Sequence, residues 1–286
     1  MNCKLPGWAL LIGLLGACAA PNSHIEPTGT QRLDAALAGC CAGGKNYPDW
    51  LVKTAETQAD WIVPISRGTK LRNAYLEEKP EAWAEVLKGA RTLDLVLIAN
   101  KSRLSGAAGE GFFGHSAVYL GGKAEMKTLG LWQDPLIRPH RALFEAGNVS
   151  IEAIDGGVRL SRPKQLFEAD AAALFHAKKL SFARKKRVVR WLLSQLGRPF
   201  DNRFDLEDPE ALYCTELIHT ALPEMALPVT QTFGRAVVWP DEVAARSLIG
   251  KTGFTFRRFV HADTNGWQVG SRNQMAAQVL AAWNAM

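Results

Sequence analysis

The sequence lacks a hydrophobic run long enough to cross a membrane. A membrane-spanning helix needs about 20 consecutive apolar residues, whereas the N-terminal apolar run, residues 8–17, is much shorter. We therefore do not expect an integral membrane protein. Hydrophobic residues make up 47% of the chain and charged residues 22%, which excludes a largely disordered chain or a collagen-like fibre. The 286 residues are enough for one large domain with a buried core.

Several common catalytic motifs are also missing. The sequence contains neither His-Glu-x-x-His nor a Cys-x-x-Cys pair, which supply the ligands of common zinc sites. It contains no Gly-x-Ser-x-Gly nucleophile elbow. Two near-matches to a phosphate-binding loop, at residues 39–46 and 245–252, each miss a required residue. We therefore expect no metal ion and no cofactor.

The N-terminus is typical of a bacterial lipoprotein. Lys4 precedes the apolar run, which suits the core of a secretion signal and ends in Leu-Gly-Ala-Cys18, a sequence that resembles a lipobox. We expect residues 1–17 to be removed and Cys18 to carry acyl chains that anchor the protein to a membrane. Ala19, in place of the aspartate that retains lipoproteins at the inner membrane, favours the outer membrane, facing the periplasm. The alternative is an ordinary cleaved signal without lipid.

The rest of the chain divides into a tether, one domain and a terminal helix. We assign residues 18–59 to a tether and N-terminal extension, 60–262 to the domain, and 263–286 to a helix with a capping pattern at Ser271. Strand-like and helical segments mix in the domain without a regular βαβ rhythm, which predicts an α+β fold. The expected strands are 93–98, 112–120, 149–154, 158–161, 171–176 and 254–259, and the expected helices include 80–88, 181–196 and 213–222.

The expected helix 181–196 overlaps the most basic part of the sequence. Seven of the residues in 178–190 are Lys or Arg, interleaved with apolar residues. The ordinary interpretation is an amphipathic helix with a solvated basic face. The alternative is a patch that rests on anionic lipid or on an acidic cell-wall polymer. The formal net charge of +6 is too small to demand nucleic acid, and we expect no such partner.

Cys214 is the cysteine that calls for an explanation. Cys40 and Cys41 are adjacent, and a disulfide between neighbours is geometrically strained, although pairing with another chain remains open. Cys214 lies deep in the folded domain without a nearby partner, which is unusual in an oxidising compartment. A helix that begins near Cys214 would favour its thiolate through the dipole and the free N–H groups. A helix that begins at Pro209 would weaken this effect, and a buried core cysteine is the commoner alternative.

His115 and Glu152 are the candidate partners of that thiol. His115 lies in the middle of an apolar strand, whereas His219, five residues after Cys214, points to another face of the helix. An imidazole that acts as a base needs a third polar group to orient it. Glu152 interrupts the apolar strand 149–154, which is expected beside the His115 strand. Its alternative interpretation is the exposed face of an edge strand.

Four blocks in this order resemble a known family. They are Gly114-His-Ser-Ala-Val-Tyr-Leu-Gly121, Ile151-Glu-Ala-Ile-Asp-Gly-Gly-Val158, Gly197-Arg-Pro-Phe-Asp-Asn-Arg-Phe-Asp205, and Leu212-Tyr-Cys-Thr-Glu-Leu-Ile218. Together they resemble the YiiX/YebB-like group, the circularly permuted branch of the NlpC-type papain-fold cysteine hydrolases, over about residues 90–262. Permutation places the histidine before the cysteine, as here.

The resemblance implies roles for individual residues. Cys214 would be the nucleophile, His115 the base and Glu152 the orienting residue, with Tyr213 and Asp201 as candidates for substrate contact. The implied fold is a permuted papain-like one, with an antiparallel sheet packed against helices. Two departures, Leu93 where glycine is more usual and Phe200 where tyrosine is common, remove no catalytic atom.

Three functions remain open at this stage. The first is an amidase or peptidase that cleaves cell-wall peptides through an acyl-enzyme. The second is a lipid hydrolase or acyltransferase, and the third is a binding module that has kept the fold without catalysis. A polar groove with a charge clamp beside Cys214 would favour the first, an apolar groove the second, and a large separation of Cys214 from His115 the third. The sequence does not determine the oligomeric state.

Overall fold

The computed structural model describes residues 29–41, 65–108, 111–232 and 234–284. The expected signal peptide, Cys18 and much of the expected tether lie outside these residues. No helix within the described ranges is long and apolar enough to span a membrane.

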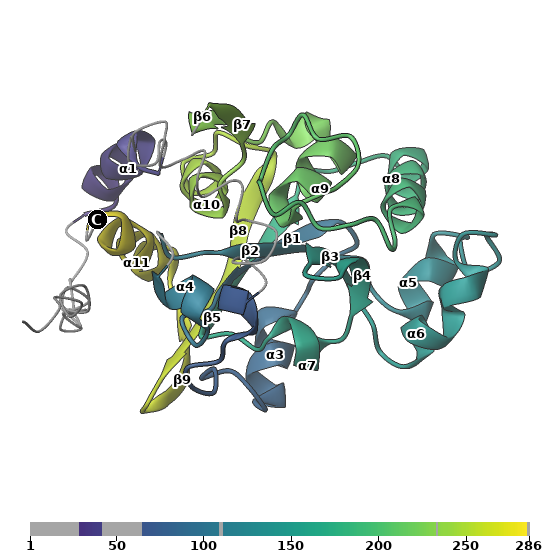
Figure 1. Cartoon of the computed structure of the whole chain (residues 1–286), viewed down its shortest axis with the longest axis horizontal. Helices are drawn as coiled ribbons and strands as arrows, with labels where there is room; N and C mark the ends of the chain where they lie inside the picture. Colours follow the sequence, from purple (N-terminus) through teal and green to yellow (C-terminus); the bar gives the residue numbers. More distant parts are fainter. Residues whose placement is uncertain (1–28, 42–64, 109–110, 233, 285–286) are drawn as a thin grey trace, which may run out of the picture.

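A seven-stranded antiparallel sheet forms the centre of the molecule (Figure 1). Its strand order is β4-β3-β2-β1-β5-β8-β9. The central strand β1 pairs with both β2 and β5 and is buried along its whole length. The strands are β1 (Asp94–Ala99), β2 (His115–Tyr119), β3 (Ser150–Ile154), β4 (Gly157–Ser161), β5 (Ala171–Ala177), β8 (Phe254–Asp263) and β9 (Gly266–Gly270).

Helices cover both faces of this sheet. Successive side chains of β1 point to opposite sides, so both faces carry apolar side chains that are buried. Leu95 and Leu97 belong to one hydrophobic cluster, and Val96 and Ile98 belong to the other. The first cluster packs against α8 (Phe182–Ser194), α9 (Cys214–Ala221), α10 (Pro240–Leu248) and α11 (Arg272–Asn284). The second packs against α3 (Pro80–Val86) and α7 (Pro163–Leu166). A large antiparallel sheet between helices fits the expected permuted papain-like architecture.

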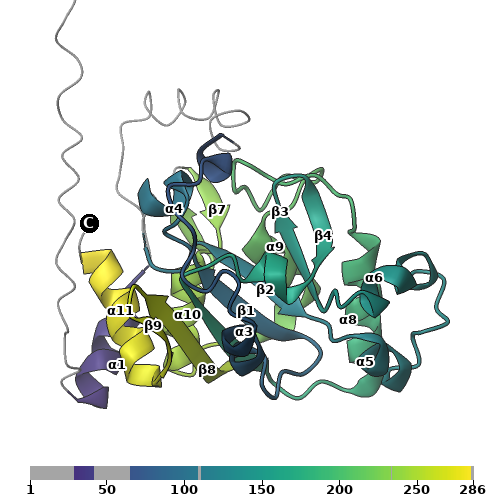
Figure 2. The same ribbon diagram turned by 90° about the horizontal axis from the view of Figure 1, so that it is seen from below.

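Shorter elements surround this core. The connection from β2 to β3 carries α5 (Lys123–Thr128), η1 (Arg138–His140) and α6 (Arg141–Glu145), which lie beside α8 at one end of the molecule (Figures 1 and 2). The remaining elements are α4 (Leu104–Ala108), η2 (Pro223–Met225) and a two-stranded sheet of β6 (Thr230–Thr232) and β7 (Arg235–Val237).

Part of the expected tether is instead a packed helix. Residues Thr30–Gly39 form α1, which contacts α10 and α11. Leu37 is fully buried, and Arg272 pairs with Asp34 at 2.5 Å. The expectation of a tether is therefore wrong for residues 30–39, which lie within the assigned range 18–59. The helix is stabilised by contacts with elements more than 200 residues later in the chain, which local composition does not reveal.

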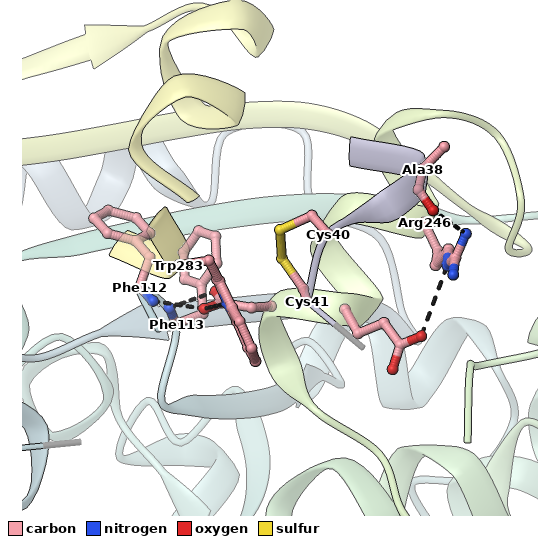
Figure 3. The surroundings of a disulfide bond; sticks show 9 residues. Ala38, Cys40, Cys41, Phe112, Phe113, Arg246 and Trp283 are labelled. Atoms are coloured by element: carbon pink, nitrogen blue, oxygen red, sulfur yellow. Dashed lines mark hydrogen bonds and ion pairs between the residues drawn. A yellow bond between two sulfur atoms is a disulfide. The ribbon is translucent and has the colours of Figure 1, made fainter. Parts of the chain in front are cut away.

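Cys40 and Cys41 form a disulfide with each other directly after α1 (Figure 3). Both residues are buried in the larger hydrophobic cluster, and Cys41 has a φ of 71°, in the left-handed region. The geometric strain expected between neighbours did not prevent the pairing. Figure 3 shows Trp283 of α11 and the backbone of Phe112 and Phe113 close to this disulfide.

The C-terminal boundary also needs correction. Residues 263–286 were assigned to the terminal helix, but β8 extends to Asp263 and turns back into β9. The helix itself, α11, begins at Arg272, directly after the capping pattern expected at Ser271. Strand β9 pairs with β8 alone at the edge of the sheet. Its side chains are largely exposed, so it lacks the apolar alternation from which a strand is predicted.

Candidate active site

Cys214 is the first residue of α9. Tyr213 before it has extended backbone angles, and residues 209–213 are not helical, so the helix does not begin at Pro209. The thiol therefore lies in the first turn, where backbone N–H groups have no partner within the helix. The positive end of the helix dipole favours a negative charge there. Cys214 is buried, with 5% of its surface exposed.

His115 lies at the start of β2, opposite Ile98 of the central strand. Helix α9 packs across β2 and β3, which brings its N-terminal thiol to the imidazole. Cys214 and His115 lie close enough for each to shift the pKa of the other. On its other side, Nε2 of His115 lies 2.7 Å from Oε2 of Glu152. The ring nitrogen left for the thiol is therefore Nδ1.

Glu152 is buried between two strands. Strand β3 lies between β2 and β4, and Glu152 is only 1% exposed, so the edge-strand interpretation is wrong. Its Oε1 accepts hydrogen bonds from Arg159 (Nε 3.1 Å, Nη2 3.0 Å) and from the Ser161 hydroxyl. Burial alone would raise the pKa of Glu152, but its contacts with His115, Arg159 and Ser161 lower it to about 2. The carboxylate is therefore ionised at neutral pH.

The three side chains change one another's ionisation. Burial acts to raise the pKa of the Cys214 thiol, but the hydrogen bond and the charge of His115 outweigh it and lower the pKa to about 7. Burial acts to lower the pKa of His115, but its contacts with Cys214 and Glu152 outweigh it and hold the pKa well above the ordinary value. A thiolate beside an imidazolium is therefore accessible near neutral pH.

Ser116 is a neighbour of the thiol that the sequence analysis missed. Its hydroxyl is buried and makes no hydrogen bond within the described part of the chain. Its hydroxyl and backbone N–H nevertheless lie close enough to Cys214 to lower the pKa of the thiol further. In the sequence, only its position directly after His115 indicated a role, because a serine within a strand does not stand out by itself.

Tyr213 and Asp201 support the chain that leads to Cys214. Tyr213 is 1% exposed, and its hydroxyl accepts a hydrogen bond from the Val238 N–H at 3.0 Å. Asp201 is 3% exposed and accepts from the N–H groups of Arg203 (2.7 Å) and Asp205 (2.5 Å). Both side chains are thus buried and hydrogen-bonded to backbone, and their contact with substrate stays a prediction.

The histidine of β5 is held in a separate pair. Nδ1 of His176 lies 2.6 Å from Oδ2 of Asp94 in β1. His219 of α9 is partly buried, its Nδ1 has no hydrogen-bond partner among the described residues, and burial lowers its pKa. Among the described residues, His115 is thus the histidine whose ring links a cysteine to a carboxylate.

A surface pocket of about 370 Å³ lies between the β3–β4 turn and the loop after α8. Asp155 in its lining directly follows β3, three residues after Glu152. Phe200, also in the lining, pairs with Leu212, two residues before Cys214. The lining residues are Asp155, Gly156, Gly197, Pro199, Phe200 and Asn202.

Comparison with known proteins gives one match. A family model described as a permuted papain-like amidase enzyme, YaeF/YiiX, C92 family, matches residues 90–278. No curated protein and no solved structure matches the chain. The matched range contains Cys214, His115 and Glu152, and it begins after Arg67 and ends before Trp283.

Proposed function

Because this chain belongs to the permuted papain-like amidase family, as its sequence blocks indicated, we propose that it is a cysteine hydrolase in which Cys214 is the nucleophile. His115 is the base and Glu152 orients it. The observation that carries this proposal is the position of His115, which hydrogen-bonds to a buried carboxylate and lies close enough to the thiol to lower its pKa. A binding module that had merely kept the fold would have no need to bury this ionised pair.

The acylation step follows from these positions. His115 holds the thiol proton, and the Cys214 sulfur attacks the carbonyl carbon of the substrate to form a C–S bond. The carbonyl oxygen becomes an oxyanion, which the free N–H groups in the first turn of α9 stabilise. His115 then gives its proton to the leaving nitrogen, the C–N bond breaks, and the amine departs. The remaining acyl group is a thioester on Cys214.

Deacylation uses the same residues in the reverse sense. His115 removes a proton from water, the resulting hydroxide attacks the thioester carbon, and the C–S bond breaks to release the acid and the thiolate. Glu152 stabilises the imidazolium in both steps and fixes the ring orientation. Proton transfer by a positioned side chain of this kind accelerates a reaction by about 10²–10⁴-fold.

We propose peptide amides of the cell wall as the substrate. The pocket between the β3–β4 turn and the loop after α8 carries a carboxylate, Asp155, and an amide, Asn202, together with Phe200 and Pro199. A polar wall of this kind suits a peptide, whereas an acyl chain would be better held by a continuous apolar groove. Hydrolysis or transfer of a lipid acyl group is the second candidate, since it uses the same acyl-enzyme chemistry.

Labelling with an electrophilic thiol probe tests the proposal. We expect purified protein to be modified once at Cys214, with the Cys214→Ala variant unlabelled and the His115→Ala variant labelled far more slowly at neutral pH. Cell-wall peptide fragments should protect the thiol, whereas phospholipid vesicles should not. Equal labelling of the wild type and the His115→Ala variant would contradict the assignment, and protection by phospholipid alone would move the substrate to the second candidate.

We further propose that the mature protein is anchored through Cys18 to the outer membrane and faces the periplasm. The support is the sequence Leu-Gly-Ala-Cys18 after an apolar run, with Ala19 following it. Metabolic labelling with a radioactive fatty acid should mark the wild type but not a Cys18→Ser variant. Incorporation of label into that variant would overturn Cys18 as the site of attachment. Fractionation of the wild-type protein with the inner membrane would overturn the proposed location.

A further inference from the structure

The carboxylate of Asp241 holds the backbone directly before His115. Its Oδ2 accepts a hydrogen bond from the N–H of Phe112 at 2.5 Å, and its Oδ1 accepts from the N–H of Phe113 at 2.7 Å. Figure 3 shows these two backbone donors. Asp241 lies in the first turn of α10 and is 2% exposed. A buried carboxylate thus fixes two of the three residues that precede the candidate base.

The residues on either side of this pair are held as well. The carbonyl of Gly111 accepts a hydrogen bond from the Lys101 ammonium at 2.8 Å. The N–H of Gly114 donates to the carbonyl of Ile98 in the central strand at 3.1 Å. A Cβ atom added at Gly111 would collide with Oδ2 of Asp241, so glycine lets the carboxylate approach this closely. Residues 111–114 therefore each contribute a backbone hydrogen bond that fixes the course of the chain.

The sheet holds His115 from one side only. Strand β2 begins at His115, and its pairing with β1 starts there. The pairing of β2 with β3 lies further along, at Val118 and Tyr119. On the side before His115, the position of the backbone thus depends on the contacts of residues 111–114. A misplacement of about 1 Å at a catalytic group can cost on the order of 10²-fold in rate.

A third donor to Asp241 comes from the C-terminal helix. Nε1 of Trp283 in α11 donates to Oδ2 at 2.8 Å. Burial raises the pKa of Asp241 to about 6, although its hydrogen bonds and the charge of Lys101 oppose the rise. The carboxylate is therefore mainly ionised at pH 7 and accepts from all three N–H groups. An asparagine has one acceptor oxygen, and its NH₂ group would face an N–H donor.

Folding alone does not explain an ionised carboxylate at this place. A buried charge destabilises the folded protein unless its contacts offset the loss of hydration, and the raised pKa of Asp241 shows that its contacts offset only part of it. An apolar residue in the first turn of α10 would avoid that cost. What the carboxylate adds is a fixed backbone two and three residues before His115.

We propose that Asp241 is a positioning residue for His115, which keeps the imidazole between Glu152 and Cys214. It acts through the histidine and is not assigned a contact with the substrate. The inference rests on the proposed function and adds to it a residue of α10. Through Trp283 it also adds a segment beyond the range matched by the family model.

The pH dependence of Cys214 alkylation by iodoacetamide tests this role. In Asp241→Asn, the midpoint should rise by about half to one pH unit, which lowers the rate at pH 7 about two- to fivefold. Asp241→Ala is a second variant in case the first folds poorly, because it removes the carboxylate without placing an NH₂ group against the backbone donors. An unmoved midpoint in both variants would overturn the proposal.

Asp94→Asn is the matched control. Asp94 is also buried, accepts from two backbone N–H groups and lies 2.6 Å from a ring nitrogen. It is opposite Tyr119, at the other end of the β1–β2 ladder from His115. This variant should lose stability without moving the alkylation midpoint. An equal rise of the midpoint in Asp94→Asn would show that any buried carboxylate of the sheet has this effect, which contradicts the specific role of Asp241.

A double-variant cycle shows whether Asp241 acts through the histidine. In the His115→Ala background, adding Asp241→Asn should leave the alkylation rate of Cys214 unchanged. General loosening of the domain would instead expose the buried thiol and speed alkylation in both backgrounds. The same fold-change with and without His115 would therefore overturn the proposal.

A measurement on the imidazole separates this inference from the proposed function. NMR titration of the His115 ring in the Cys214→Ala variant follows its contact with Glu152, which raises its pKa, without a reactive thiol. Adding Asp241→Asn should lower the pKa of the ring by about half to one unit. That result supports the positioning role even if Cys214 proves not to be a nucleophile. An unchanged pKa contradicts it even if Cys214 and His115 prove catalytic.

Discussion

Replacing Glu152 by glutamine tests the candidate site most directly, because the substitution keeps the size of the side chain and removes its charge. In the wild type, Oε2 faces His115 and Oε1 accepts from Arg159 and Ser161. A glutamine has one acceptor oxygen and one NH₂ donor group. It cannot satisfy both sides, so either the imidazole or the guanidinium loses its partner.

The magnitude follows from the ionisation of the buried groups. Burial acts to raise the pKa of Glu152, but its contacts, led by those with His115, outweigh burial and lower the pKa from 4.5 to about 2. A shift of that size corresponds to about 3 kcal/mol. His115 supplies the largest of the lowering contacts, so we expect the variant to weaken the thiolate–imidazolium pair by about 1–3 kcal/mol, which raises the pKa of Cys214 by about one to two units.

The assay is the pH dependence of alkylation of Cys214 by iodoacetamide. The wild type should show a midpoint near pH 7, where the pKa of the thiol lies, and Glu152→Gln should move the midpoint upward by about one to two units. Glu145→Gln, which changes an exposed carboxylate that pairs with Lys123, should leave the midpoint in place. An unmoved profile in a Glu152→Gln protein of normal thermal stability would refute the orienting role.

The same carboxylate should also make the free energy of unfolding depend on pH. The pKa of Glu152 is lower in the folded protein than its ordinary value of 4.5, so its stabilisation is complete above pH 4.5 and is lost as the pH falls toward 2. The wild type should therefore lose about 3 kcal/mol across this window from this group. Chemical denaturation at several pH values should give a flatter curve for Glu152→Gln, and parallel curves would contradict the linkage.

Two further substitutions test elements that support the site. Trp283→Phe removes the indole donor that binds Oδ2 of Asp241 at 2.8 Å; we expect it to lower the free energy of unfolding by about 1–2 kcal/mol, and an unchanged thermal midpoint would show that α11 is not held through this bond. Gly157→Ala places a Cβ 2.4 Å from the backbone oxygen of Arg198 at a φ of +103°. We expect this variant to lower the free energy of unfolding by about 1–3 kcal/mol and to slow the alkylation of Cys214. A fully stable variant would contradict the tight contact between the β3–β4 turn and the loop after α8.

Much of the fold was predictable from local patterns. The expected strands 93–98, 149–154 and 171–176 agree closely with β1, β3 and β5, because apolar and β-branched runs mark buried strands. The end of the helix predicted at 181–196 was set by Gly197 and Pro199. Among the elements that were missed, α1 and β9 have weak patterns of their own and are stabilised by distant partners.

The candidate site was only partly predictable. Cys214, His115 and Glu152 stood out one at a time, as an unpaired thiol, a histidine in an apolar strand and a carboxylate in another. Ser116 and Arg67 did not stand out, since a serine in a strand and an arginine in an N-terminal segment are ordinary. Their positions beside the thiol and the pocket arise from the packing of α9 on β2 and from the stacking of Arg67 on Phe200.

By itself, the sequence determined which residues carry reactive groups, because a thiol, an imidazole or a carboxylate is a property of the residue type. It also determined most of the strands, since apolar patterns report burial over short distances. Only the tertiary structure decided that Cys214 begins its helix, that Glu152 is buried rather than on an edge, and that Asp155 and Asn202 share a pocket. Those facts depend on contacts between segments about 40 to 100 residues apart, whose register no local pattern records.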